Sequence, residues 1–302
     1  MRRPVLLVLS CLLLVACTER NRSTHLLPTP TDAGEAPPGA EEDAATRLAR
    51  APAATASSGT ARTTLVATVT GLPGRPEPMV LRGEGVIDFA AARSRSVLGV
   101  ASARGGGTAG DLAFETVTAD GLLYVRAPAL TSLAETAISW VRIDPTAPAG
   151  DDGAGQGAPG FGPLTGLAGS DLGAPIALLA GVDASSVREV GTETTDGTTT
   201  TSLRATVDPV AASAGGATPD DLSALEAFLE GIGARRLEVE AELDEDDRLL
   251  RLVYEHEVAT PAGPVHQRFD MAYFDFGAAV EVSTPPDDQV RDPAAPERQG
   301  PR

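Results

Sequence analysis

The chain has 302 residues, of which 42 are acidic and 24 basic, giving a formal net charge of −18. This excess of negative charge argues against nucleic-acid binding, which needs a basic face to displace counterions. It also keeps the body of the protein off an anionic membrane surface. The only two cysteines lie in the first 17 residues, so a disulfide framework is excluded and packing alone must hold the folded part together.

The N-terminus has the features of a signal peptide. Arg2 and Arg3 precede an apolar run over residues 5–16, which is too short to cross a bilayer but suits the hydrophobic region of a secretory signal. The tetrad Leu14-Val15-Ala16-Cys17 resembles the lipobox of bacterial lipoproteins. The resemblance implies that residues 1–16 are removed, with Cys11 among them, and that Cys17 carries the acyl chains. Several chains on one residue give stable anchoring, so we expect a protein tethered to the extracytoplasmic face of the cell membrane.

The segments at the two ends of the mature chain are polar and rich in proline. Residues 17–39 comprise the lipidated Cys17 and a flexible tether, and residues 287–302 are expected to be a disordered tail. The intervening residues 40–286 suit one domain. The chain lacks lysine and is rich in alanine and glycine, a composition that indicates a GC-rich genome such as an actinobacterium's.

Within this domain a few helical patterns interrupt many strands. Residues 40–56 predict a helix, and strand patterns follow at 62–70, 79–89, 95–103, 111–119, 122–127 and 139–143. A short apolar helix at 172–181 precedes strands at 186–194 and 198–208. Residues 219–231 show the clearest helix, with proline in the first turn and glycines at the end. A hairpin over 235–258 and a strand at 264–276 complete the series.

The alternation within the hairpin indicates how the sheet is covered. Leu237, Val239, Ala241 and Leu243 alternate with glutamates, which is typical of an antiparallel sheet with one buried and one solvated face. The predicted fold class is therefore α+β, a large curved antiparallel sheet with a few helices packed against one side.

Catalytic and metal-binding patterns are weak in this domain. Two histidines, His256 and His266, lie on adjacent predicted strands, where a two-histidine metal site is possible but neighbouring residues often point to opposite faces. The acidic run over residues 244–247 lacks the spacing and glycine of a calcium loop and is more simply a solvated hairpin turn. No G-x-S-x-G nucleophile elbow is present. These patterns therefore give little support for a metal site or an enzyme, and a hydrolase is the least favoured of the functions considered.

A long segment rich in glycine and proline at residues 145–171 has two interpretations. A loop of this length inside a compact domain is usually functional or disordered. Phe161 and other apolar side chains could contact an apolar ligand from a mobile lid, or the segment could be a tolerated low-complexity insertion.

The inward faces of the strands suggest a ligand cavity. Aromatic residues are only 4% of the chain, and small residues interrupt several inward faces, so a wide sheet with modest helices could enclose an apolar space. The residues expected to line it are Met79, Leu81, Ile87, Phe89, Leu112, Phe114, Phe161, Leu237, Val239, Leu252, Tyr254, Phe269 and Met271. For each single residue, an ordinary core position is the alternative.

Several stretches resemble a known family. SSVREVGTETTDGTTTTSLRATVD at 185–208 resembles the V-x-x-V-G-x-E-x-x-x-G-x-x-T pattern of actinobacterial lipid-binding lipoproteins of the LppX/LprG type. LLYVRAP at 122–128 and YFDFGAAVEVSTPP at 273–286 are also similar to family motifs in the same order. The resemblance spans most of residues 40–286. It implies a LolA-like half-barrel whose concave side, roofed by helices, holds lipid tails without a catalytic triad or cofactor.

Two functional hypotheses follow. In the first, the protein binds the apolar chains of an envelope lipid or lipoglycan and carries or presents it, with a membrane transporter or acceptor protein as a possible partner. In the second, a sensor or interaction lipoprotein of the same fold docks a membrane partner without carrying lipid.

Overall fold

The computed structural model describes residues 40–100, 113–126, 140–144, 172–195, 197–214, 219–260 and 263–291. All of them belong to one compact unit within Pro37–Arg302. The predicted signal peptide, Cys17 and the predicted tether lie outside the described residues. Among the described residues, no helix is both long and apolar enough to cross a membrane.

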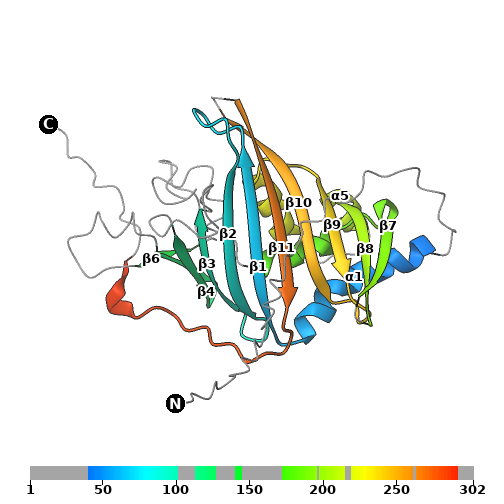
Figure 1. The fold of residues 1–302 in the computed structure, drawn as a ribbon, viewed down its shortest axis with the longest axis horizontal. Coiled ribbons are helices and arrows are strands. Elements are labelled where there is room, and N and C mark those ends of the chain that lie inside the picture. The colour runs from blue at the N-terminus through cyan, green and yellow to red at the C-terminus, as the bar shows by residue number, and fades with distance from the viewer. Residues whose placement is uncertain are drawn as a thin grey trace, which may run out of the picture. The chain divides into compact units, whose positions relative to one another are not determined.

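Twelve strands in the described part of the chain form one sheet, in the order β12-β6-β5-β4-β3-β2-β1-β11-β10-β9-β8-β7 (Figure 1). Neighbouring strands are antiparallel except β12 and β6, which are parallel. The strands are β1 (Thr60–Thr70), β2 (Met79–Asp88), β3 (Arg93–Val100), β4 (Phe114–Ala119), β5 (Leu122–Arg126), β6 (Trp140–Ile143), β7 (Arg188–Thr195), β8 (Thr198–Val207), β9 (Leu237–Leu243), β10 (Leu249–Thr260), β11 (Gly263–Phe274) and β12 (Val290–Arg291).

The helices are few and short. They are α1 (Ala40–Ser57), α4 (Ala174–Ala177), α5 (Pro209–Ala214) and α6 (Pro219–Gly231), with 3₁₀ turns η3 (Leu178–Gly181), η4 (Ala184–Ser186) and η5 (Asp287–Gln289). Because β12 and β7 end the sheet without pairing with each other, the sheet is open. The predicted fold class, an α+β half-barrel with a large antiparallel sheet and a few helices against it, is confirmed.

Alternating side chains give the sheet two different faces. In β9, the burial alternates strictly from Leu237 to Leu243, and β11 shows the same pattern from Val265 to Tyr273. The buried set points to the side on which α1 contacts β9 and β10, α4 contacts β10 and η3 contacts β8. We call this side the helix-covered face and the other side the open face.

The strands follow one another through tight turns where the sequence allows it. Asp120 and Gly121 join β4 to β5, and both have positive φ, 55° and 75°. A two-residue hairpin turn with positive φ at both positions matches the twist of the flanking strands, and Asp-Gly is a favoured pair for it.

A second, smaller core lies on the open face near one end of the sheet. Val117, Ala119, Tyr124 and Trp140 are buried there, and Val282 and Val290 of the C-terminal segment pack against them. The Arg126 guanidinium lies 4.9 Å from the centre of the Trp140 ring, a cation–π distance.

The C-terminal segment differs from the sequence expectation. Residues 287–291 belonged to the expected disordered tail, but they form η5 and β12, and β12 pairs with β6 through Val290 and Trp140. The physical reason is local, because Val290 enters the small core beside Trp140 and gains burial there. Residues 292–302 lie outside the described residues.

Candidate functional site

Most of the predicted cavity residues lie together on the helix-covered face. Ten of them are buried members of a single hydrophobic cluster that also contains side chains of α1, η3 and α6, and Phe89 packs against it partly buried. The ten are Met79, Leu81, Ile87, Phe114, Leu237, Val239, Leu252, Tyr254, Phe269 and Met271. Leu112 and Phe161 lie outside the described residues. The structure thus forms one continuous apolar layer between sheet and helices, and the role of its residues in ligand binding stays a prediction.

A row of small side chains crosses this face near the start of β1. The register places Thr63 beside Gly85, Gly85 beside Ser96 and Ser96 beside Thr116. The hydroxyls of Ser96 and Thr116 are 2.7 Å apart and hydrogen-bonded. The Thr63 hydroxyl is buried without a hydrogen-bond partner. We call this row of four adjacent small residues the trough, because the missing side chain at Gly85 leaves room for a side chain from another segment.

Leu172 covers this trough at Gly85. Its side chain is 3% exposed, and its Cδ1 would lie only 2.5 Å from a Cβ built at Gly85. The Tyr273 hydroxyl donates a long hydrogen bond of 3.4 Å to the Leu172 carbonyl. One leucine therefore occupies space that the sheet itself leaves open. The sequence showed small residues on the inward faces but gave no sign of which side chain would cover them.

Aromatic rings gather in another part of the layer, on β10, β11 and α6. Tyr254 and Phe269 are register partners with stacked rings 4.9 Å apart. His256 lies next along β10, its ring 5.7 Å from Phe269 and nearly parallel to it. Phe228 of α6 meets Tyr254 edge-on at 6.2 Å. The cluster joins two strands of the sheet to a covering helix.

The two titratable groups in this cluster are held neutral by burial. Desolvation raises the pKa of the Tyr254 hydroxyl and lowers the pKa of His256 to about 4. Both shifts disfavour the charged form, as expected where apolar groups replace water. At neutral pH, this end of the layer is therefore polar but uncharged.

The two histidines do not form a metal site. His256 pairs with Gln267 and His266 with Glu257, so the rings point to opposite faces of the sheet. The Nδ1 atom of His266 lies 3.4 Å from a Glu257 oxygen on the open face. In the described part of the chain, no group of three or more metal-ligating side chains occurs.

The acidic hairpin is a turn, as predicted, but two of its four carboxylates are not solvated. Asp244 and Asp247 are 4% and 8% exposed. Arg248 binds Asp244 at 2.7 Å, and both Arg47 and Arg50 of α1 bind Asp247 at 2.6 and 2.5 Å. Basic side chains far away in sequence cover the turn, which a local charge pattern cannot reveal.

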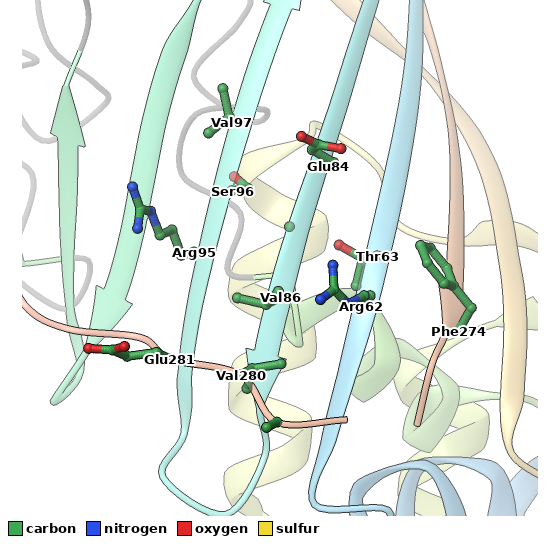
Figure 2. A pocket seen from close by; sticks show the side chains of 12 residues that line it. Arg62, Thr63, Glu84, Val86, Arg95, Ser96, Val97, Phe274, Val280 and Glu281 are labelled. Atoms are coloured by element: carbon green, nitrogen blue, oxygen red, sulfur yellow. The ribbon is translucent and has the colours of Figure 1, made fainter. Parts of the chain in front are cut away.

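The open face has two shallow pockets. The first, of about 370 Å³, lies between β1–β3 and the C-terminal segment, and Arg62, Glu84, Arg95 and Glu281 line it together with valines (Figure 2). The second, of about 660 Å³, lies over β1, β10 and β11 and is lined by charged residues that include Glu255 and Arg268. Both pockets carry charges of both signs, and neither is lined by a predicted cavity residue.

Comparisons with known proteins give structural neighbours only. No protein-family model matches the chain, and no curated protein is detectably similar in sequence. Similar solved structures include LprF from Mycobacterium bovis, 17% identical over 80% of this chain and 97% of that chain, with a TM-score of 0.38.

Two further similar structures carry lipoprotein names. The lipoprotein LppX from Mycobacterium tuberculosis is 13% identical over 79% of this chain and 99% of that chain, with a TM-score of 0.35. A putative outer membrane lipoprotein-sorting protein domain from Vibrio parahaemolyticus is 11% identical over 80% of this chain and 95% of that chain, with a TM-score of 0.29. LppX is of the lipoprotein type that the sequence motifs resemble.

Proposed function

We propose that this protein is a membrane-anchored extracytoplasmic lipoprotein that binds the apolar chains of an envelope lipid or lipoglycan and carries or presents it. The observation that carries the proposal is the continuous apolar layer between an open sheet and a separate cover of helices. Binding of hydrocarbon requires such a layer and no catalytic group, and we expect no enzymatic activity.

The way in which α6 contacts the apolar layer suits a ligand that enters between the sheet and this helix. α6 contacts the rest of the cluster through Leu225, Phe228 and Leu229, all of them apolar. A hydrocarbon chain that enters there replaces one apolar surface by another, so separation of the layers does not leave polar groups without partners. A turn of the Leu172 side chain away from Gly85 would free space over the trough for an apolar chain.

The energy available from such binding is ample. Each buried methylene contributes about 0.8 kcal/mol, so an acyl chain of some 16 methylenes yields on the order of 13 kcal/mol before costs. Loss of translational freedom and the displaced protein contacts reduce this figure.

The anchor would confine the carrier to the membrane that supplies its ligand. Acylation at Cys17 and the tether over residues 18–39 would let the domain move beside the bilayer, and the net charge of −18 would keep its surface from adhering to anionic headgroups. A membrane transporter or acceptor protein is the partner that such a carrier needs.

The direct test is to identify what the protein holds. Full-length protein is extracted from membranes in a mild detergent, purified, and its organic extract is analysed by mass spectrometry. We expect close to one equivalent of an acylated lipid, above the level in an unrelated acylated lipoprotein treated in the same way. Repeated extracts of folded protein without lipid would refute the proposal and favour a lipid-free interaction lipoprotein.

A further inference from the structure

One nitrogen on the helix-covered face has no partner. The Nδ1 atom of His256 is buried and makes no hydrogen bond, although the ring is fixed beside Phe269 and Tyr254. A buried polar atom without a partner costs free energy, so its persistence in an ordered aromatic cluster calls for a reason. A ligand group that hydrogen-bonds to it would supply one.

The position of this atom suits the polar end of a lipid. His256 follows the buried Tyr254 along β10, and its register partner Gln267 is itself buried, at 3%. Toward the trough, the same face continues with the apolar Phe269 and Met271. The seven residues from Gln267 to Tyr273 make six steps along the strand and span about 20 Å at the rise of a strand, a length comparable to an extended acyl chain. His256 and Gln267 are therefore a polar pair within the apolar layer, with Phe269 and Met271 on the side toward Leu172 and Val265 on the other side.

We propose that His256, with Gln267 beside it, binds the hydroxyl group of an uncharged lipid head whose acyl chain lies along β10 and β11 toward Leu172. This inference rests on the proposed function and adds a ligand class to it. A hydroxyl fits because it both donates and accepts, so it can pair with Nδ1 whichever ring nitrogen carries the proton.

The charges around His256 argue against an anionic head. Glu255, Glu257 and Arg268 alternate with the inward residues along β10 and β11, so their side chains point to the open face. They line the second pocket, whose lining also includes His256 and Gln267. No cation of these two strands therefore accompanies His256 on the helix-covered face. A phosphate buried there would lack the charge-assisted hydrogen bonds that it needs.

The test compares three probes on delipidated full-length protein in detergent: dioleoylglycerol with a free hydroxyl, dioleoyl phosphatidate with a charged head, and squalene with no head. Bound probe is quantified by mass spectrometry over a range of concentrations. We expect dioleoylglycerol to bind at least about tenfold more tightly than phosphatidate.

Variants assign this preference to the histidine. His256→Leu should bind dioleoylglycerol about tenfold more weakly and squalene as the parent does. His256→Asn, whose amide lies near the position of Nδ1, should restore most of the affinity. His266→Leu on the open face is the matched control and should change nothing, and thermal unfolding verifies that each variant is folded.

The outcomes separate the two proposals. If squalene and dioleoylglycerol both bind but His256→Leu binds them as the parent does, the His256 site is refuted while lipid binding stands. A preference for phosphatidate would also refute it. If no probe binds the folded parent protein, the proposed function fails and the His256 site with it.

Discussion

The contact between α1 and the acidic hairpin gives a quantitative prediction. Asp247 accepts hydrogen bonds from Arg47 Nε at 2.6 Å, from Arg50 Nε at 2.9 Å and from Arg50 Nη2 at 2.5 Å. Asp247→Asn removes the charge and keeps the side-chain shape. Asn also tolerates the positive φ of 61° at this position, so the substitution tests the ion pairs and leaves the turn intact.

The expected loss follows from the burial of the three partners. Removing one member of a fully buried ion pair costs about 3–5 kcal/mol. The Arg50 side chain is 58% exposed and Arg47 19%, so solvent screens part of the interaction. We expect Asp247→Asn to lower the free energy of unfolding by about 2–3 kcal/mol, which moves the urea midpoint by about 1 M.

The same interaction depends on pH in a defined direction. Burial alone would raise the pKa of Asp247, but the hydrogen bonds and charges of Arg47 and Arg50 outweigh it and hold the pKa below its usual value. A carboxyl with a lowered folded-state pKa stabilises the fold above its unfolded pKa of about 3.9, and the benefit is lost as the pH falls through the folded value. The stability difference between the parent and Asp247→Asn should therefore shrink below about pH 4.

Urea unfolding followed by circular dichroism at pH 7 and pH 3 measures both effects. The matched control is Asp246→Asn in the same turn, where the side chain is 75% exposed and a loss below about 0.5 kcal/mol is expected. Equal losses for the two variants at pH 7, or a loss for Asp247→Asn that persists unchanged at pH 3, would contradict the assigned ion pairs.

Three further predictions test other parts of the molecule. Cys17→Ser should move the protein from the membrane to the soluble extracytoplasmic fraction while Cys11→Ser leaves it in the membrane, as fractionation and blotting would show. Gly181→Ala places a Cβ 2.2 Å from Leu225 Cδ2 and should lower stability by about 1–3 kcal/mol, whereas Gly191→Ala, with open space around it, should change it by less than about 0.5. Burial lowers the pKa of His256 to about 4, so the unfolded chain takes up this proton at a higher pH than the folded protein does. The free energy of unfolding should therefore decrease as the pH falls from about 6.5 to 4. His256→Leu should lack this part of the pH dependence in urea titrations.

The sequence predicted the elements well because their signals are local. Alternation in 264–276 and a proline-started apolar stripe in 219–231 correspond to β11 (Gly263–Phe274) and α6 (Pro219–Gly231). The period of a strand also indicates which side chains point inward, and the cavity candidates that the structure describes belong to one cluster on the helix-covered face. Such patterns depend only on neighbours in the chain.

What the sequence could not predict depends on contacts between distant segments. Leu172 covers Gly85 from 87 positions away, and Arg47 binds Asp247 from 200 positions away. The pairing of Val290 with Trp140 ordered a segment whose composition indicates disorder. The orphaned Nδ1 of His256 is likewise a property of the packed layer, because in sequence the residue is only one histidine in a strand.

The attachment of the covering helices predicts where the layer opens. α1 is fixed to the hairpin by the Arg47–Asp247 pair and by Thr55, whose hydroxyl accepts a hydrogen bond from the Leu249 amide. α6 depends on apolar contacts such as that of Phe228 with Tyr254. If a lipid chain enters between sheet and cover, the amides of α6 should exchange hydrogen faster in delipidated protein and slow several-fold on loading with dioleoylglycerol, while those of α1 change little. Hydrogen exchange read by mass spectrometry on both forms decides this, because protection gained in α1 and not in α6 would place the entry under the other helix.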